Sequence, residues 1–319
     1  MKKFIIASTI FVLTALIYLI FINNEDLNVL IPRESDNAIS IESDNKLVIH
    51  FINMGRNDGI VIQTNDIVIA IDGGAYHEAD LIINYMKALG ITHIDILIGS
   101  HVHFNHIQSH ARILQSFTVG KLYYPHELEL CFERNICNPN DVRYVLDEIN
   151  YQNKEINIMK ARDIIEVGPI TIESFGPLTK GTFRDHRWPQ NYNSLNFILT
   201  FGNHRFFFTG DGMQEANILS TFYDSNLKVD VFKFPHHGED VLSAEFINKI
   251  SPRYVVETNH TSQLVGVNRR TGNLLLDIGA SILYFEDNRH IIFFTDGINL
   301  FYKRKTINQF LEMGDSDEA

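Results

Sequence analysis

The chain has 319 residues, of which 45% are hydrophobic and 21% are charged, and its formal net charge at pH 7 is −12. This composition is typical of a folded protein and excludes a collagen-like or mainly disordered chain. No broad basic surface is expected, so the sequence carries no strong nucleic-acid-binding signature. The length after the polar N-terminal stretch suffices for one large domain or two small ones.

Residues 1–22 predict a membrane anchor or a signal segment. Two lysines precede an unbroken apolar run from Phe4 to Ile22, and two acidic residues come closely after it. A helix of this length nearly spans a bilayer core of about 30 Å. Because cytoplasmic flanks are rich in Lys and Arg, we expect a single-pass anchor with residue 1 in the cytoplasm and an extracytoplasmic domain. The alternative is a cleaved signal peptide and a secreted protein, although no small-x-small cleavage site comes after the run.

Strand and helix patterns alternate over residues 46–305, which we expect to form one domain. Residues 23–45 are polar and largely acidic and predict a flexible linker, and residues 306–319 predict an acidic tail. The expected strands are residues 47–53, 60–63, 67–71, 94–98, 167–175, 194–201, 205–209, 229–234, 254–257 and 290–295. The expected helices are residues 79–89, 107–117, 213–222 and 244–250. This order predicts an α/β (α+β) fold of two similar halves, each a sheet with helices on its outer face.

Three histidines, His101, His103 and His106, come directly after the expected strand 94–98. Their short spacing on a turn lets the imidazole rings converge on one point. Neutral imidazole is a strong ligand for zinc and similar ions. A single histidine is usually a satisfied core residue or a surface residue, whereas three at this spacing predict a metal site.

Three further positions come after apolar strands in the same way. Asp211 lies in a Thr-Gly-Asp-Gly sequence, and His236 and His237 lie in Pro-His-His-Gly. Asp72 ends the expected strand 67–71 in front of two glycines. Each of these signals is weak or moderate alone, and together they predict polar residues gathered at one edge of the fold.

The order of these motifs resembles the metallo-β-lactamase superfamily. Asp-Gly-Gly, His-x-His-x-Asn-His, Thr-Gly-Asp and Pro-His-His-Gly succeed one another along the chain as they do in that family. Within it, the motifs are most similar to those of the extracellular hydrolase domain of ComEC-type DNA-uptake competence proteins. The stretches HFINMGRNDGIVI (50–62) and DNRHIIFFTDG (287–297) also fit, so the resemblance runs from about residue 47 to 303.

The resemblance implies a four-layer αββα sandwich with its site at one edge, between two sheets. It implies metal ligands at His101 and His103 for metal 1, at Asn105, His106 and His237 for metal 2, and at Asp211 as a bridge. It implies a catalytic set of Asp211, His236 and Asn105, in which His236 stabilises the transition state. The resemblance also implies that Asp72 orients one of the metal ligands without contacting the metal itself. The implied cofactor is zinc, as one or two ions, with manganese as the alternative.

The sequence departs from the family pattern at position 105, where Asn stands in place of the usual Asp. An amide oxygen is neutral and is a weaker ligand than a carboxylate, so a second ion should bind more weakly. His186 is a candidate third ligand for metal 1. The two cysteines, Cys131 and Cys137, are too few for a four-sulfur zinc site, which leaves a local disulfide or two unpaired thiols.

The sequence is compatible with three functions. The first is a metal-dependent hydrolase that acts through a metal-bound hydroxide on a phosphoester, either a nucleic acid or a phosphorylated surface polymer. Small-molecule substrates such as lactones, β-lactams and thioesters are not separated from it. The second is a degenerate protein of the same fold that binds a ligand or partner with little catalysis. The third is an unrelated surface-interaction protein. The membrane is an expected contact through the N-terminal segment, and no protein partner is indicated.

Overall fold

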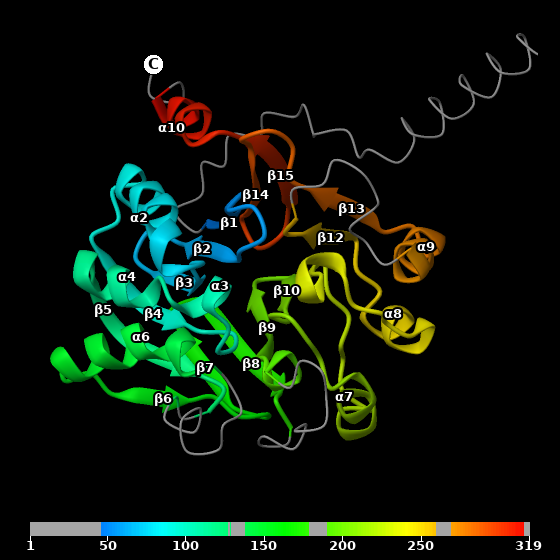
Figure 1. The fold of residues 1–319 in the computed structure, drawn as a ribbon. Helices are drawn as coiled ribbons and strands as arrows, with labels where there is room; N and C mark the ends of the chain where they lie inside the picture. The colour runs from blue at the N-terminus through cyan, green and yellow to red at the C-terminus, as the bar shows by residue number, and fades with distance from the viewer. Residues whose placement is uncertain (1–45, 127, 129–137, 179–189, 260–268, 316–319) are drawn as a thin grey trace, which may run out of the picture.

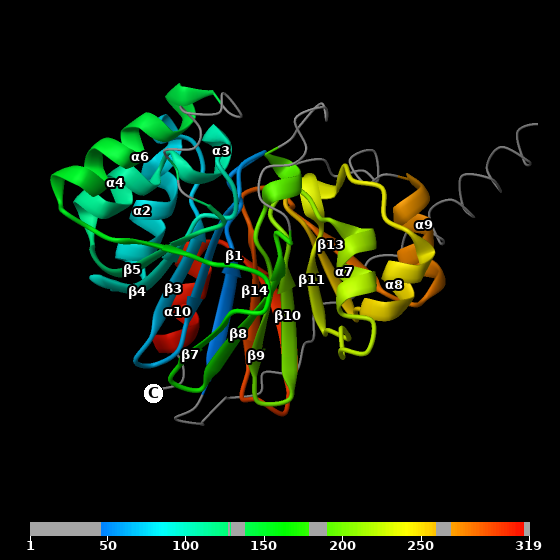
Figure 2. The same cartoon turned by 90° about the horizontal axis from the view of Figure 1, so that it is seen from below.

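Two mixed β-sheets lie face to face at the centre of the molecule, and helices cover the outer face of each (Figure 1, Figure 2). The structure is a computed structural model that describes residues 46–126, 128, 138–178, 190–259 and 269–315. The facing sheets and outer helices confirm the expected α/β arrangement of two halves.

The first sheet has eight strands in the order β15-β14-β1-β2-β3-β4-β5-β6. Neighbours from β15 to β3 are antiparallel, and neighbours from β3 to β6 are parallel. The strands are β1 (Leu47–Phe51), β2 (Gly59–Gln63), β3 (Val68–Asp72), β4 (His93–Ile98), β5 (Thr118–Tyr124), β6 (Ile156–Ile158), β14 (His290–Thr295) and β15 (Leu300–Lys305).

The second sheet has seven strands in the order β13-β12-β11-β10-β9-β8-β7. Neighbours from β7 to β10 are antiparallel, and neighbours from β10 to β13 are parallel. The strands are β7 (Ile164–Val167), β8 (Ile170–Gly176), β9 (Asn196–Phe201), β10 (His204–Phe208), β11 (Val231–Lys233), β12 (Tyr254–Glu257) and β13 (Ser281–Tyr284).

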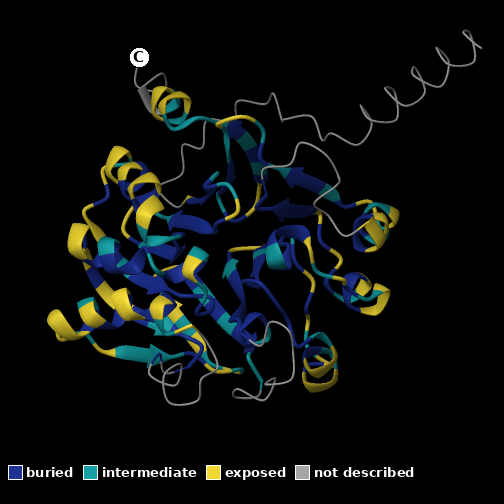
Figure 3. Ribbon diagram, in the orientation of Figure 1, coloured by how far each residue is buried: buried dark blue, intermediate teal, exposed yellow. Residues whose placement is uncertain are grey.

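The helices form the two outer layers and carry most of the exposed residues (Figure 2, Figure 3). The first sheet is covered by α2 (Ala79–Ala88), α4 (His110–Ser116), α6 (Pro139–Tyr151) and α10 (Ile307–Asp315). The second is covered by α7 (Glu215–Thr221), α8 (Ala244–Ile250) and α9 (Arg269–Asp277). The single turn α3 (Phe104–Ile107) and the 3-10 helices η1 (Tyr76–Glu78), η2 (Asn191–Asn193) and η3 (Pro235–Gly238) lie in the connections.

The central core fills the space between the sheets. In β1, Leu47, Ile49 and Phe51 face the second sheet, whereas Val48 faces α10. Both faces of the strand are therefore buried, which explains why its sequence is a continuous apolar run and not an alternating one.

Several elements differ from the sequence-based expectation. The expected strand 167–175 is confirmed as β8 but begins at Ile170, because Gly168 turns the chain at φ +55° after the unexpected strand β7. The expected helix 107–117 is confirmed as α4 but begins at His110, because the Ser109 amide donates to the Gly74 carbonyl at 3.0 Å and Ile107 ends the separate turn α3. The strands β5, β6, β13 and β15 and the helices α6, α9 and α10 were not expected.

The C-terminal helix α10 lies within the stretch expected to be an acidic tail. Phe310 and Met313 pack against the outer face of β1 and β14, so the folded part extends beyond residue 305. The expected anchor at 1–22 and linker at 23–45 lie outside the described residues. Among the described residues, no helix is both long enough and apolar enough to cross a membrane.

Replacing Phe293 with Ala should test the central core. Phe293 is 1% exposed and contacts the rings of Phe51 in its own sheet and Tyr254 in the facing sheet. We expect the free energy of unfolding to fall by about 3–5 kcal/mol, because the substitution leaves a cavity between the sheets. Urea denaturation measures this change. Tyr151→Ala, at a side chain that is 86% exposed, is the matched control with a change below about 0.5 kcal/mol. A Phe293→Ala loss no larger than the control's would contradict this assignment of the core.

Candidate metal centre

The polar residues selected from the sequence meet at one edge of the two sheets. The strands β3 and β4 of the first sheet and β10, β11 and β12 of the second all end there. The carboxyl ends of neighbouring parallel strands lie at the same edge of a sheet, which is where the sites of α/β proteins usually form. Loops that are far apart in the sequence therefore deliver side chains to one place.

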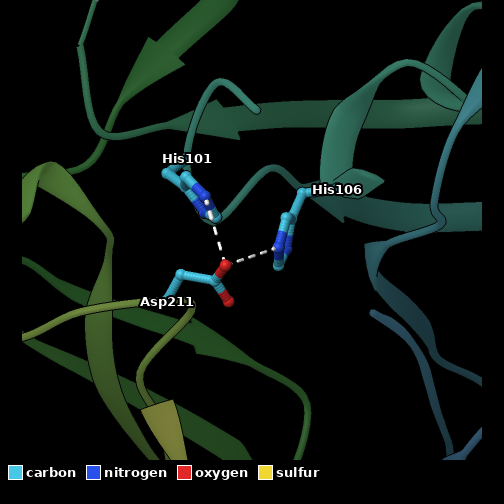
Figure 4. A group of neighbouring side chains, drawn as sticks. All are labelled: His101, His106 and Asp211. Atoms are coloured by element: carbon cyan, nitrogen blue, oxygen red, sulfur yellow. Dashed lines mark ion pairs between the residues drawn. The ribbon is translucent and has the colours of Figure 1, made fainter. Parts of the chain in front are cut away.

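Three imidazole rings surround the carboxylate of Asp211. The Nε2 atoms of His101, His106 and His237 lie 3.8, 3.2 and 3.5 Å from Asp211 Oδ2. Figure 4 shows His101 and His106 pointing toward Asp211 from the opposite side of the centre. None of the four side chains is more than 6% exposed. Four potential ligand atoms from both sheets thus converge on one buried point.

The rings of His101 and His106 are oriented by groups behind them. His101 Nδ1 lies 3.1 Å from Ser100 Oγ, and His106 Nδ1 lies 2.8 Å from Asp72 Oδ2. Asp72 also accepts hydrogen bonds from the Ser100 amide and hydroxyl, both at 2.7 Å. With Nδ1 engaged in this way, each ring presents Nε2 to the centre, as carboxylate–histidine–metal arrangements require.

The ring of His237 is oriented by a different carboxylate. Its Nδ1 lies 3.1 Å from Thr258 Oγ1 and 3.3 Å from Asp58 Oδ1. Asp58 and Thr258 were not selected from the sequence. Asp58 lies in the stretch 50–62 that resembles the opening motif of the family, but no role was assigned to it from the sequence.

The backbone is strained next to the centre. Asp72 has φ +56°, and both His236 and His237 have φ +53°. For a residue other than glycine this left-handed conformation costs roughly 1–2 kcal/mol. Two such residues in succession persist only where the surroundings enforce them, and this is common at functional sites.

The Thr-Gly-Asp-Gly turn that carries Asp211 is held by the start of β9. The Asn196 amide group donates to the carbonyls of Thr209 at 3.0 Å and Gly212 at 2.9 Å. The Asp211 amide donates to Ser194 Oγ at 3.2 Å. The carboxylate position therefore depends on side chains from a neighbouring strand as well as on its own loop.

His103 and Asn105, the other implied ligands, border the centre. His103 Nδ1 lies 3.0 Å from His101 Nε2, so both rings face the same point. Asn105 Nδ2 donates to the Arg56 carbonyl at 3.2 Å and lies 3.3 Å from His237 Nε2.

His236 lies at the margin of the centre, and three other residues singled out from the sequence are not described. The His236 side chain is 26% exposed, and its Nδ1 is 3.7 Å from Asp240 Oδ1. His186 and the cysteines Cys131 and Cys137 lie outside the described residues, so their predicted roles stay predictions.

Lys233 is a further residue of the centre that sequence reasoning missed. Its side chain is 1% exposed, pairs with Asp58, and donates to the Gly210 carbonyl at 2.8 Å. Its position between Phe232 and Phe234, in an otherwise apolar strand, was the available signal. A charged side chain in a buried strand needs a partner, because desolvation of an unpaired charge is costly.

The charged groups shift one another's pKa values strongly. Burial alone would lower the pKa of His106 and His237, but Asp211 with Asp72 or Asp58 raises these values to about 10 and about 9. Burial favours the neutral form of Asp211, yet His106 and His237 hold its pKa well below the usual range. Burial keeps the pKa of His101 well below 6.5, so this ring is neutral.

The ligand set fits a transition-type divalent ion. Ligand atoms of His101, His106 and Asp211 lie within 4.8 Å of one another, as do those of Asp58, Asp211 and His237. Within the described part of the chain, the buried atoms His106 Nε2 and Asp211 Oδ1 form no hydrogen bond. An unsatisfied buried polar atom costs about 1–3 kcal/mol, and coordination of an ion removes that cost. Imidazole nitrogen and carboxylate oxygen are also the donors that zinc accepts, and manganese takes carboxylate well.

Comparison with known proteins gives one distant relative in sequence. No family model matches the chain. ComE operon protein 3 of Bacillus subtilis (strain 168) is 24% identical over 179 residues, which are 55% of this chain and 21% of that protein. The chain therefore matches about a fifth of the length of this relative.

Solved structures give similarity of fold. CmlA, a diiron β-hydroxylase from Streptomyces venezuelae, has a TM-score of 0.50 at 11% identity, covering 82% of this chain and 55% of that one. YhfI from Bacillus subtilis, a metallo-β-lactamase fold protein, has a TM-score of 0.49 at 11% identity, covering 79% and 100%. With two facing mixed sheets, outer helices and a His/Asp centre at their shared edge, this chain has the metallo-β-lactamase fold, and its sequence is similar to part of ComE operon protein 3.

Proposed function

We propose that the chain is a metal-dependent hydrolase that acts on a phosphoester. The observation that carries this proposal is the convergence of three Nε2 atoms on Asp211 Oδ2, with every opposite ring nitrogen held by the protein. Metal ligands are characteristically held in this way by groups behind them. A cluster that binds no metal would incur the cost of holding these groups without any gain. The proposed ion is zinc, as one or two ions per chain, with manganese as the alternative.

The chemistry divides between the ion and the chain. When bound, a divalent ion supplies a nucleophile at neutral pH and polarises the bond to be cleaved. His101, His103, His106, His237 and Asp211 bind it, and Ser100, Asp72 and Asp58 orient these ligands. His236, partly exposed beside His237, is the group that we assign to the negative charge that develops on the substrate.

The choice of a phosphoester rests on the motif resemblance and on the relative in sequence. We further propose that the domain is extracytoplasmic and is tethered to the membrane by residues 1–22. Its proposed substrate is a nucleic acid or a phosphorylated surface polymer.

A second function is favoured by one observation. Asn105 places a neutral amide group 3.3 Å from His237 Nε2, and an amide binds a divalent ion more weakly than a carboxylate does. A degenerate centre that binds a ligand or partner with little catalysis is therefore the alternative, and substitution at position 105 separates the two.

The number of bound ions is the first test. We expect the protein, purified without chelator, to carry one or two zinc or manganese ions per chain by mass spectrometry, and Asp211→Asn to carry fewer. The same variant should lose at least about 100-fold in hydrolysis of a phosphodiester such as bis-p-nitrophenyl phosphate, because Asp211 lies at the centre of the ligand set. Absence of bound metal even after reconstitution would contradict the proposal.

Asn105→Asp should strengthen a second metal position. A carboxylate adds a negative charge beside His237, so we expect about tenfold tighter binding of the weaker ion, measured by calorimetric titration. If the native protein is inert and Asn105→Asp creates activity, the degenerate alternative is correct. Asn203→Asp, on the β9–β10 turn, is a matched control that should change neither quantity.

Metal binding should strengthen as pH rises from 6 to 8. In the metal-free protein His106 and His237 have pKa values raised to about 10 and about 9, so both rings are protonated in this range. An ion binds only the neutral ring and must displace these protons, so affinity should rise about tenfold per pH unit for each proton. Calorimetry with Co²⁺ in buffers of different ionisation enthalpy counts the released protons. A dissociation constant that does not change with pH would show that these rings are not ligands.

A further inference from the structure

The buried ammonium group of Lys233 lies between Asp58 and the turn that carries Asp211 in the metal centre. It pairs with the Asp58 carboxylate, donates to the Gly210 carbonyl at 2.8 Å, and lies 3.8 Å from Asp211 Oδ1. The side chains of Lys233 and Asp58 are each 1% exposed. Every neighbour that satisfies this ammonium group therefore belongs to the framework of the centre.

The two oxygens of Asp211 have different surroundings. Oδ2 faces the imidazole nitrogens of the ligand histidines, and Oδ1 faces Lys233. Lys233 also holds the carbonyl of the residue directly before Asp211. Through these two contacts Lys233 controls both the backbone and the rotation of the carboxylate.

The two oxygens of Asp58 divide in the same way. Oδ2 pairs with Lys233, and Oδ1 lies 3.3 Å from His237 Nδ1. Asp58 precedes β2 of the first sheet, whereas Lys233 ends β11 of the second, so the ion pair crosses between the sheets. A displacement of either residue would move Asp211 and His237 together.

Building on the hydrolase function proposed above, we propose that Lys233 and Asp58 are positioning residues that act as one unit. Lys233 holds the turn that carries Asp211 and the Oδ1 atom of its carboxylate, and Asp58 holds the ring of His237. The pair thereby sets the distance between two metal ligands that come from different loops.

A role in charge balance alone makes the opposite prediction. Removing a nearby positive charge strengthens the attraction of the centre for a cation. Loss of positioning weakens binding instead, and substitution of groups that orient metal ligands typically costs 10–100-fold in affinity. The sign of the change in affinity therefore separates the two roles.

The experiment compares Lys233→Met, the double variant Asp58→Asn/Lys233→Met, and Lys228→Met as a control in the full chain. Lys228 is exposed and is not part of the centre. The double variant removes both charges with little change in volume, so it leaves no uncompensated buried charge. Each protein is stripped with chelator and titrated with Co²⁺, and the visible absorption of the bound ion reports its coordination.

We expect the double variant to bind Co²⁺ about 10–100-fold more weakly than the parent and with a changed visible spectrum, and Lys228→Met to match the parent. We expect Lys233→Met to weaken binding as well. Binding of the double variant within threefold of the parent and with the parent's spectrum would overturn the inference, and tighter binding of Lys233→Met than of the parent would assign a charge role only and overturn it as well. Failure of the double variant to fold by circular dichroism would make the pair structural and would also overturn it.

Hydrolysis of bis-p-nitrophenyl phosphate is measured separately on the same proteins. A parent that binds Co²⁺ but hydrolyses no phosphodiester refutes the proposed function, and the affinities of the variants still decide the positioning role. A parent that hydrolyses the phosphodiester while the double variant binds normally refutes only the positioning role.

Discussion

The buried carboxylate of Asp211 is the constraint around which the centre is organised. It is 3% exposed, and an anion removed from water is tolerated only when cations and hydrogen-bond donors surround it. Here the protonated rings of His106 and His237 lie beside one oxygen, and the ammonium group of Lys233 lies beside the other. This carboxylate raises the pKa values of His106 and His237, so both rings are protonated in the metal-free protein. Their positive charge replaces part of the charge that an ion would supply.

The fold tolerates this concentration of charge because the charged side chains are attached to the ends of different strands, which hold them in place. Asp72 and the His101–His106 loop come from the first sheet, and the turns of Asp211 and His237 come from the second. The apolar layer between the sheets holds these ends in register, and the left-handed residues at Asp72, His236 and His237 are the local conformational cost.

The charge of the centre bears on its chemistry. Three buried carboxylates, Asp58, Asp72 and Asp211, face one buried ammonium group, Lys233, and position 105 contributes a neutral amide. A single divalent ion balances the resulting excess of negative charge once the rings are neutral. Under the proposed function, a second ion would bind beside Asn105, which adds no carboxylate and is a weaker ligand.

The sequence by itself determined the β-rich two-half pattern and the main ligand candidates, because His101, His106, Asp211 and His237 lie directly after apolar strands in recognisable local motifs. It did not determine the α3–α4 break, helix α10, or the roles of Asp58, Thr258 and Lys233. A local pattern reports only the residues next to each strand along the chain, whereas the partners of a buried charge are chosen when distant strands pack. Lys233 shows the difference: its place between two phenylalanines was a local signal that no prediction used, and only the packing of the two sheets decided that Asp58 and the Asp211 turn would be its partners.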